Sequence, residues 1–182
     1  MNRKTFFFLS RFSNQYLREK FNQESNLSLT NKVLGISSLI TYAGHEVEII
    51  VTNTGNIKNS KLDKTSEGKI KILKPRSFNI LNLRYINYLL NIISTLIIIK
   101  KLNSHNSYFI LWDYLPDSVI PVLLAKIPKD NIIMDLEEKI QDDPEAGAFF
   151  KWFERFFENK ITDNYFSPNS EIIKEKKKKL LL

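Results

Sequence analysis

Short apolar runs alternate with helix-like segments along this chain of 182 residues, and that alternation constrains the fold more than any other feature. The runs are continuously apolar rather than strictly alternating, which is typical of parallel strands covered on both faces. We therefore predict one α/β domain, a single Rossmann-like doubly wound parallel sheet with helices on both faces. The predicted strands are Lys4–Leu9, Glu46–Thr52, Lys69–Leu73, Tyr108–Trp112, Asn131–Leu136 and Asn164–Phe166, and the predicted helices are Leu29–Ala43, Asn79–Leu102, Pro116–Lys126 and Pro144–Lys160.

The connecting segments differ in composition. Arg11–Asn26 is polar with scattered aromatic residues and is predicted to be a long loop or a loose helix, and Asn53–Gly68 is predicted to be a surface loop. Gly44 stands where a left-handed residue ends a helix. Lys69–Leu73 alternates Lys with apolar residues, which places it near a sheet edge.

Two segments are candidates for contacts outside the domain. Ile86–Ile99 is apolar over 14 residues, short of the roughly 20 that span a bilayer, and carries polar residues at helical spacing. We predict a mostly buried helix with a narrow polar stripe and no transmembrane span. The aromatic face of Pro144–Lys160 is predicted to be core, with a partner surface as the alternative; it consists of Phe149, Trp152, Phe153, Phe156 and Phe157.

The net charge of +7 is unevenly distributed. Lys174–Leu182 holds five Lys and one Glu and so carries +4, which leaves +3 for the other 173 residues. A nucleic-acid binder matches Lys and Arg to phosphates along a whole face, so no nucleic-acid partner is predicted. The chain has no Cys, which fits a reducing compartment, and the apolar run Phe6–Leu9 is too short for a signal peptide. We expect a cytoplasmic protein, with peripheral contact at the inner face of the membrane as a further expectation.

In an open parallel sheet, ligands bind beyond the carboxyl ends of the strands. Four polar stretches fall there: Ser10–Asn14, Asp113-Tyr114, Asp135–Glu138 and Ser167–Ser170. Between Asp135 and Glu145, six acidic residues face one Lys, a local charge of −5. The catalytic candidates are Asp135, Glu137 and Glu138, since carboxylates can orient sugar hydroxyls or act as a general base, although acidic residues here also suit the start of the next helix. The substrate-binding candidates are Ser13, Asn14, Asp113, Tyr114, Ser167 and Asn169.

Several familiar signatures are missing from the sequence. There is no phosphate loop of the Gly-x-x-x-x-Gly-Lys type, no Gly-x-Gly-x-x-Gly turn and no nucleophile elbow, which argues against kinases, GTPases, ordinary dehydrogenases and α/β-hydrolases, and weakens a small methyltransferase. His45 and His105 precede strands at the opposite end of the sheet, so they are interpreted as structural or solvent-exposed. No metal site is predicted.

Three segments resemble the N-terminal, acceptor-side domain of family-4-like GT-B glycosyltransferases. Lys32–Thr52 contains Gly44-His-Glu-Val47 between a helix and an apolar strand, Ile132–Glu138 resembles the Asp/Glu motif after a later strand, and Asp163–Ser170 resembles the strand before the second domain. The resemblance implies a GT-B half that binds a glycan or lipid-linked sugar acceptor in cell-surface polysaccharide synthesis. It also implies a nucleotide-sugar held by a second domain and no metal or cofactor, while the glycine turn that many members carry after strand one is replaced by Arg11–Asn26.

On this resemblance, residues 1–173 form the Rossmann-like domain and residues 174–182 a Lys/Leu tail. The codons for the four consecutive Lys residues of the tail form an adenine-rich tract that is prone to reading-frame slippage. We therefore expect a truncation or frameshift there, which leaves the chain inactive without a donor-binding domain. The alternative is a non-catalytic Rossmann-like module that binds anionic membrane through the tail. The residues do not decide between inverting and retaining transfer.

Overall fold

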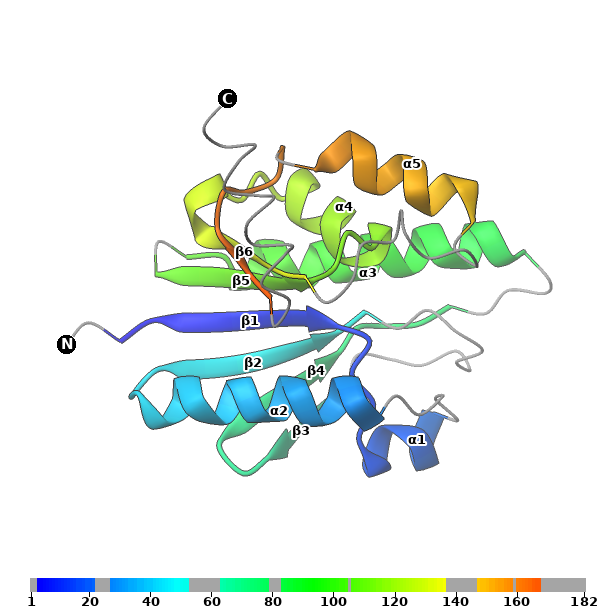
Figure 1. Cartoon of the computed structure of the whole chain (residues 1–182). Coiled ribbons are helices and arrows are strands. Elements are labelled where there is room, and N and C mark those ends of the chain that lie inside the picture. Colours follow the sequence, from blue (N-terminus) through cyan, green and yellow to red (C-terminus); the bar gives the residue numbers. More distant parts are fainter. Residues whose placement is uncertain are drawn as a thin grey trace.

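A computed structural model of the chain describes residues 3–21, 27–52, 63–78, 83–104, 106–136, 147–158 and 160–167. Strands and helices alternate along most of this length (Figure 1). The elements are β1 (Thr5–Ser10), α1 (Gln15–Phe21), α2 (Leu27–Tyr42), β2 (Glu46–Val51), β3 (Asp63–Glu67), β4 (Ile70–Lys74), α3 (Arg84–Leu102), β5 (Ser107–Trp112), α4 (Pro116–Leu124), the 3-10 turn η1 (Lys129–Asn131), β6 (Ile132–Asp135), α5 (Ala148–Phe157) and β7 (Tyr165–Phe166).

The strands form one sheet in the order β3-β4-β2-β1-β5-β6-β7, and every pair except β3 with β4 is parallel. From β1 the chain builds outward through β2 to β4, then returns across the sheet and continues on the other side of β1 with β5. This reversal is the switch point of a doubly wound fold, and its carboxyl edge lies beside β1 and β5. The predicted Rossmann-like α/β fold is confirmed.

Helices cover both faces of the sheet, because adjacent strand residues point to opposite sides. Phe7 and Leu9 of β1 belong to the cluster that packs under α3, α4 and α5, whereas Phe8 belongs to the cluster that packs under α1 and α2. In Figure 1, α3, α4 and α5 gather above the strands and α2 lies below them. The predicted left-handed residue after α2 is also confirmed, with Gly44 at φ 87°.

The prediction that 53–68 is entirely loop is wrong at its end. Asp63–Glu67 pairs antiparallel with β4, and the two strands are joined through Gly68, which has φ 59°. Polar strands such as β3 are found at sheet edges, where charged side chains discourage pairing with another chain. The sheet therefore has an antiparallel edge. Lys69–Leu73, predicted to lie near an edge, corresponds to β4, the second strand from that edge.

The prediction that the Ile86–Ile99 helix is mostly buried is also wrong. α3 can press only one face onto the sheet, and that face includes two residues of the predicted polar stripe, Asn91 and Thr95, both buried. Asn91 Oδ1 accepts a hydrogen bond from the backbone N–H of Phe78 at 3.1 Å, and the Thr95 hydroxyl donates to the carbonyl of Asn91 at 3.1 Å. Polar groups with internal partners are satisfied in the interior. The aliphatic residues on the opposite face, such as Ile93, are left facing outward.

The aromatic helix is likewise only partly core. Phe153 is buried against the α4 side of the sheet, and Phe157 packs beside it. Phe149, Trp152 and Phe156 keep between 45 % and 55 % of their surface exposed. Six of the ten residues of α5 are aromatic, more than one helix face can turn toward the sheet, so the prediction of an all-core face is wrong for these three.

Candidate functional site

The candidate site is the carboxyl edge of the sheet, where the ends of β1, β2, β5 and β6 are joined by hydrogen bonds. The backbone N–H of Thr52 donates to the carbonyl of Ser10 at 2.9 Å, and the backbone N–H of Asp113 donates to the carbonyl of Asp135 at 3.0 Å. Asp113 has φ 50°, a left-handed conformation that Asp adopts more readily than most residues. These bonds hold the loops that leave the strands side by side.

An ion pair lies at the switch point. Arg11, directly after β1, places its Nε 3.2 Å from Oδ2 of Asp117 in the first turn of α4, and Asp117 is almost completely buried. The Asp117 carboxylate raises the pKa of Arg11 above its ordinary value. Burial, and next the same carboxylate, raise the pKa of Tyr88 in α3. The pair thus ties the loop after β1 to the α3 and α4 side of the sheet.

A second ion pair lies on the α2 side. Lys32 Nζ is 2.6 Å from Oδ1 of Asp135 at the end of β6, and 5.8 Å from the centre of the Phe166 ring in β7. The Asp135 side chain has no exposed surface, whereas 20 % of the Lys32 side chain is exposed. In this arrangement Lys32 is the member of the pair that can meet a ligand, and Asp135 holds it in place.

Ser13 and Asn14, predicted to bind substrate, make structural contacts. The Ser13 backbone N–H and carbonyl are both bonded to the Thr30 hydroxyl, at 3.3 and 3.1 Å, which fastens the loop to α2. Asn14 Oδ1 accepts a hydrogen bond from the backbone N–H of Leu17 at 2.9 Å and so caps α1. The Asn14 amide also donates to Glu67 at 3.3 Å.

The remaining predicted residues are spread differently than expected. Tyr114 is 1 % exposed and packs in the core under α4, so its ring belongs to the interior in this arrangement. Asp113 is also buried, and Ser167 is half-buried directly after β7. Asp113 and Ser167 therefore follow β5 and β7, and Asp135 ends β6 between them. Glu137, Glu138 and Asn169 lie outside the described residues, as do His105 and the tail 174–182.

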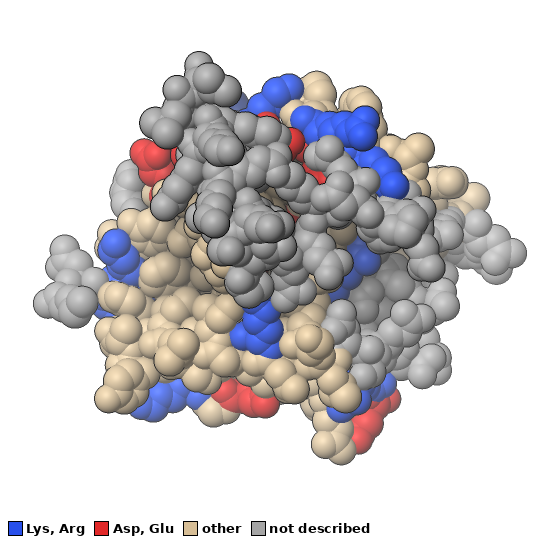
Figure 2. All heavy atoms as spheres, in the orientation of Figure 1, with Lys and Arg blue, Asp and Glu red and all other residues tan. Residues whose placement is uncertain are grey.

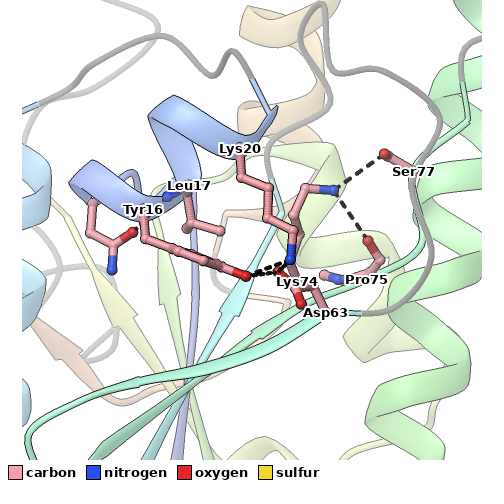
Figure 3. A network of polar contacts seen from close by, with 8 residues as sticks. Tyr16, Leu17, Lys20, Asp63, Lys74, Pro75 and Ser77 are labelled. Carbon is pink, nitrogen blue, oxygen red and sulfur yellow. Dashed lines mark hydrogen bonds and ion pairs between the residues drawn. The ribbon is translucent and has the colours of Figure 1, made fainter.

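A small polar hollow lies at the ends of β2 and β4, lined by Val51, Thr52, Lys74, Pro75, Arg76, Ser77, Asn91 and Thr95. Lys74 Nζ donates to the Ser77 hydroxyl at 3.2 Å and to the Pro75 carbonyl at 3.4 Å (Figure 3). Burial lowers the pKa of Lys74 to about 8. The enclosed space in this hollow is about 10 Å³, room for at most one water molecule, so the hollow is too small to be a sugar site of its own.

Beside this hollow, α1 is attached to the sheet edge by a polar network. Asp63 of β3 accepts a hydrogen bond from the Tyr16 hydroxyl and forms an ion pair with Lys20 Nζ, both at 3.0 Å (Figure 3). The hydrogen bond to Tyr16, followed by that to Asp63, raises the pKa of Lys20. The segment after β1, predicted to be a long loop or a loose helix, therefore contains a helix, α1, held at the carboxyl edge.

Sequence reasoning missed Arg11, Lys32 and Asp117. Arg11 directly follows a predicted strand, and Asp117 follows Pro116 at a predicted helix start, so position alone could have marked them. No feature of the sequence pattern distinguishes Lys32, because its partner, Asp135, lies in a strand far along the chain. Within the described residues, no group of three His, Asp or Glu is arranged to hold a metal ion.

Comparisons with known proteins identify no family for this chain. No family model matches the chain, and no curated protein matches it. Among solved structures, the chain is similar to the crystal structure of a probable GTP-binding protein, EngB, with 15 % identity, 94 % of this chain and 95 % of that chain covered, and a TM-score of 0.32. At that TM-score the likeness carries no argument about ligand or activity.

Proposed function

We propose that this chain is the acceptor-binding half of a glycosyltransferase of GT-B type, which passes a sugar from a nucleotide-sugar to a glycan or lipid-linked acceptor in cell-surface polysaccharide synthesis. The observation that supports the proposal is the presence of polar side chains from several parts of the chain at the carboxyl edge, beside the switch point. Arg11 follows β1, Lys32 lies in α2 and Asp113 follows β5. Several donors and acceptors spread over one edge suit a polyhydroxylated ligand better than a single charged group would.

In this proposal the acceptor lies across the ends of β1, β5 and β6. Lys32 and Arg11 donate hydrogen bonds to its hydroxyl oxygens, and Asp135 positions Lys32. Glu137 and Glu138 are the proposed groups for orienting the acceptor hydroxyl or removing its proton, since carboxylates suit both tasks. The nucleotide-sugar is held by a second domain, and the sugar is transferred between the two.

The direct test is a titration of the ¹⁵N-labelled chain with a panel of oligosaccharides and polyprenyl-linked sugars, followed by amide shifts. We expect saturable shifts centred on the residues after β1, β5 and β6, and a loss of about tenfold or more in affinity for Lys32→Met. Lys71→Met is the matched control, because Lys71 also pairs with a strand carboxylate, Glu48, but on the part of β2 and β4 away from this edge. Binding of nucleotides with no sugar binding at this edge would contradict the proposal.

The alternative is a non-catalytic module held on anionic membrane by residues 174–182. Its test is salt-sensitive vesicle binding that disappears when those residues are deleted. Because the tail lies outside the described residues, that alternative depends on its composition alone.

A further inference from the structure

Four aliphatic side chains form a continuous outward stripe along α3. Their spacing of three, four and four residues keeps them on one helix face, and each has between 41 % and 55 % of its surface exposed. They are Ile86, Leu89, Ile93 and Ile97. An ordinary surface helix shows a polar face to water, whereas α3 buries Asn91 and Thr95 beside Ile92 and Ile99 and exposes these four aliphatic residues. An exposed aliphatic stripe of this kind indicates a contact with something apolar.

A second apolar surface projects from α5. Trp152 stacks on Phe156 with ring centres 5.4 Å apart, and Phe149 lies 6.2 Å from Trp152. Ile99 of α3 and Phe153 of α5 belong to one core cluster on one side of the sheet. Both helices therefore lie on the same side of the sheet, as Figure 1 shows.

The charges around these two faces are basic. α3 contains no Asp or Glu, and its last turn carries Lys100 and Lys101. The only acidic residue of α5, Glu154, is 3 % exposed, whereas Arg155 is exposed. In Figure 2, Lys and Arg side chains, with some Asp and Glu beside them, lie at the upper edge, where Figure 1 places α5. Lys160 lies with its Nζ 3.7 Å from the centre of the Phe156 ring, beside the aromatic surface.

We propose that the outward faces of α3 and α5 form a docking surface for an anionic lipid bilayer. Aliphatic and aromatic side chains enter the boundary between headgroups and acyl chains, as in interfacial amphipathic helices, and the flanking Lys and Arg contact anionic headgroups. Trp and Phe suit this depth because their rings are large and apolar. The proposal rests on residues outside the candidate site and the tail, and is independent of the proposed function.

α3 lies along the membrane in this proposal and does not cross it. The segment Tyr85–Leu102 is long and apolar enough to span a bilayer by length and composition, with 28 % of it buried. However, Ile92 and Ile99 pack into the domain, and Asn91 is hydrogen-bonded to the Phe78 backbone. Pulling α3 into the bilayer core would expose these polar groups to hydrocarbon, which costs several kcal/mol for each unsatisfied group.

Charge favours a bilayer over a second copy of this chain. Two α3 stripes facing each other would bring Lys100 and Lys101 of both copies to the interface with no acidic residue on either helix. Like charges at an interface oppose association. An anionic surface removes that repulsion and gains from the same residues.

The experiment is cosedimentation of the full chain with vesicles of phosphatidylcholine mixed with phosphatidylglycerol, and with phosphatidylcholine alone. We expect binding to the anionic vesicles, weakened by salt, and a loss of roughly tenfold or more for Leu89→Gln/Ile93→Gln and for Trp152→Gln/Phe156→Gln. Leu39→Gln/Tyr42→Gln is the matched control, because these α2 side chains are 70 % and 92 % exposed on the opposite side of the sheet. The control should bind as the unmodified chain does.

A second measurement needs no apolar-to-polar substitution. Brominated lipids should quench the fluorescence of Trp152, and Trp152→Phe should abolish that quenching although Trp112 remains. Three results would overturn the proposal. They are no binding to anionic vesicles, binding by the α3 and α5 glutamine variants equal to that of the unmodified chain, and binding that depends only on residues 174–182. A dimer in light scattering that Leu89→Gln/Ile93→Gln makes monomeric, without vesicle binding, would assign the surface to a second copy instead.

Discussion

The ammonium group of Lys32 lies 2.6 Å from a carboxylate oxygen of Asp135, although the two residues are 103 positions apart in the chain. Lys32 comes from the second turn of α2, and Asp135 ends β6. The pair therefore attaches the helix on one face of the sheet to a strand on the far side of the switch point. The contact also holds the partly exposed ammonium group of Lys32 at the carboxyl edge of the sheet.

Lys32→Met should destabilise the fold by about 3 kcal/mol, the lower end of the range for breaking a buried ion pair. The Asp135 side chain is fully covered and would lose this cation, while Lys32 itself is 20 % exposed, which moderates the loss. Urea unfolding followed by circular dichroism measures the change. Lys71→Met, which breaks a more exposed pair with Glu48, should cost less than about 1 kcal/mol, and equal losses for the two variants would count against the assignment.

Lys74 should make stability depend on pH in the alkaline range. Because burial lowers its pKa from 10.5 to about 8, the folded chain releases this proton at lower pH than the unfolded chain does. Between these two values the unfolded state binds more protons, so the contribution of Lys74 to the free energy of unfolding rises with pH. Below about pH 8 the folded state carries the cost of a buried charge.

Lys74→Met should remove that rise. Urea midpoints measured from neutral pH to about pH 10 should increase less with pH in the variant than in the unmodified chain. The control is Lys71→Met in the same strand. Hydrogen bonding to Glu48 raises the pKa of Lys71, so the stabilising contribution of Lys71 is lost only at pH values above its ordinary pKa. A Lys74→Met profile parallel to that of the unmodified chain would refute the prediction.

Two glycines should respond to alanine in opposite directions. Gly44 ends α2 at φ 87°, where a Cβ costs about 1–2 kcal/mol, so Gly44→Ala should destabilise the chain. Gly35 lies within α2, and an added Cβ would meet no atom within 4 Å, so Gly35→Ala should stabilise it by about 0.5–1 kcal/mol. Thermal unfolding of both variants measures the two changes in stability. Changes in the same direction would contradict the prediction.

The fold could be predicted because its main signal is local. Continuous apolar strands such as Phe6–Leu9, separated by helix patterns, indicate a covered parallel sheet in any context, and Gly44 marks a helix end through its own backbone freedom. β3 was missed because its polar side chains lack the apolar signal of a strand. It forms since β4 offers an unpaired edge and Gly68 allows the turn.

The candidate site was only partly predictable. Strand ends directed attention to Asp113 and Asp135, but Ser13 and Asn14 form local structural contacts that their residue types alone do not reveal. Arg11 and Lys32 were missed because each pairs with a carboxylate from a distant part of the chain. Residue type and position indicate that an edge is polar, but not which groups are covered by others.

The sequence by itself therefore determined the α/β class, the order of most elements and the edge of the sheet where polar groups collect. Those properties follow from short-range patterns of apolar residues and turn formers. Only the tertiary structure decided which face of α3 turns inward, how much of α5 remains exposed and which charges pair across the switch point. These depend on the packing of segments far apart in the chain, where a helix such as α3 can bury one face and must leave the other, with Leu89 and Ile93, outside.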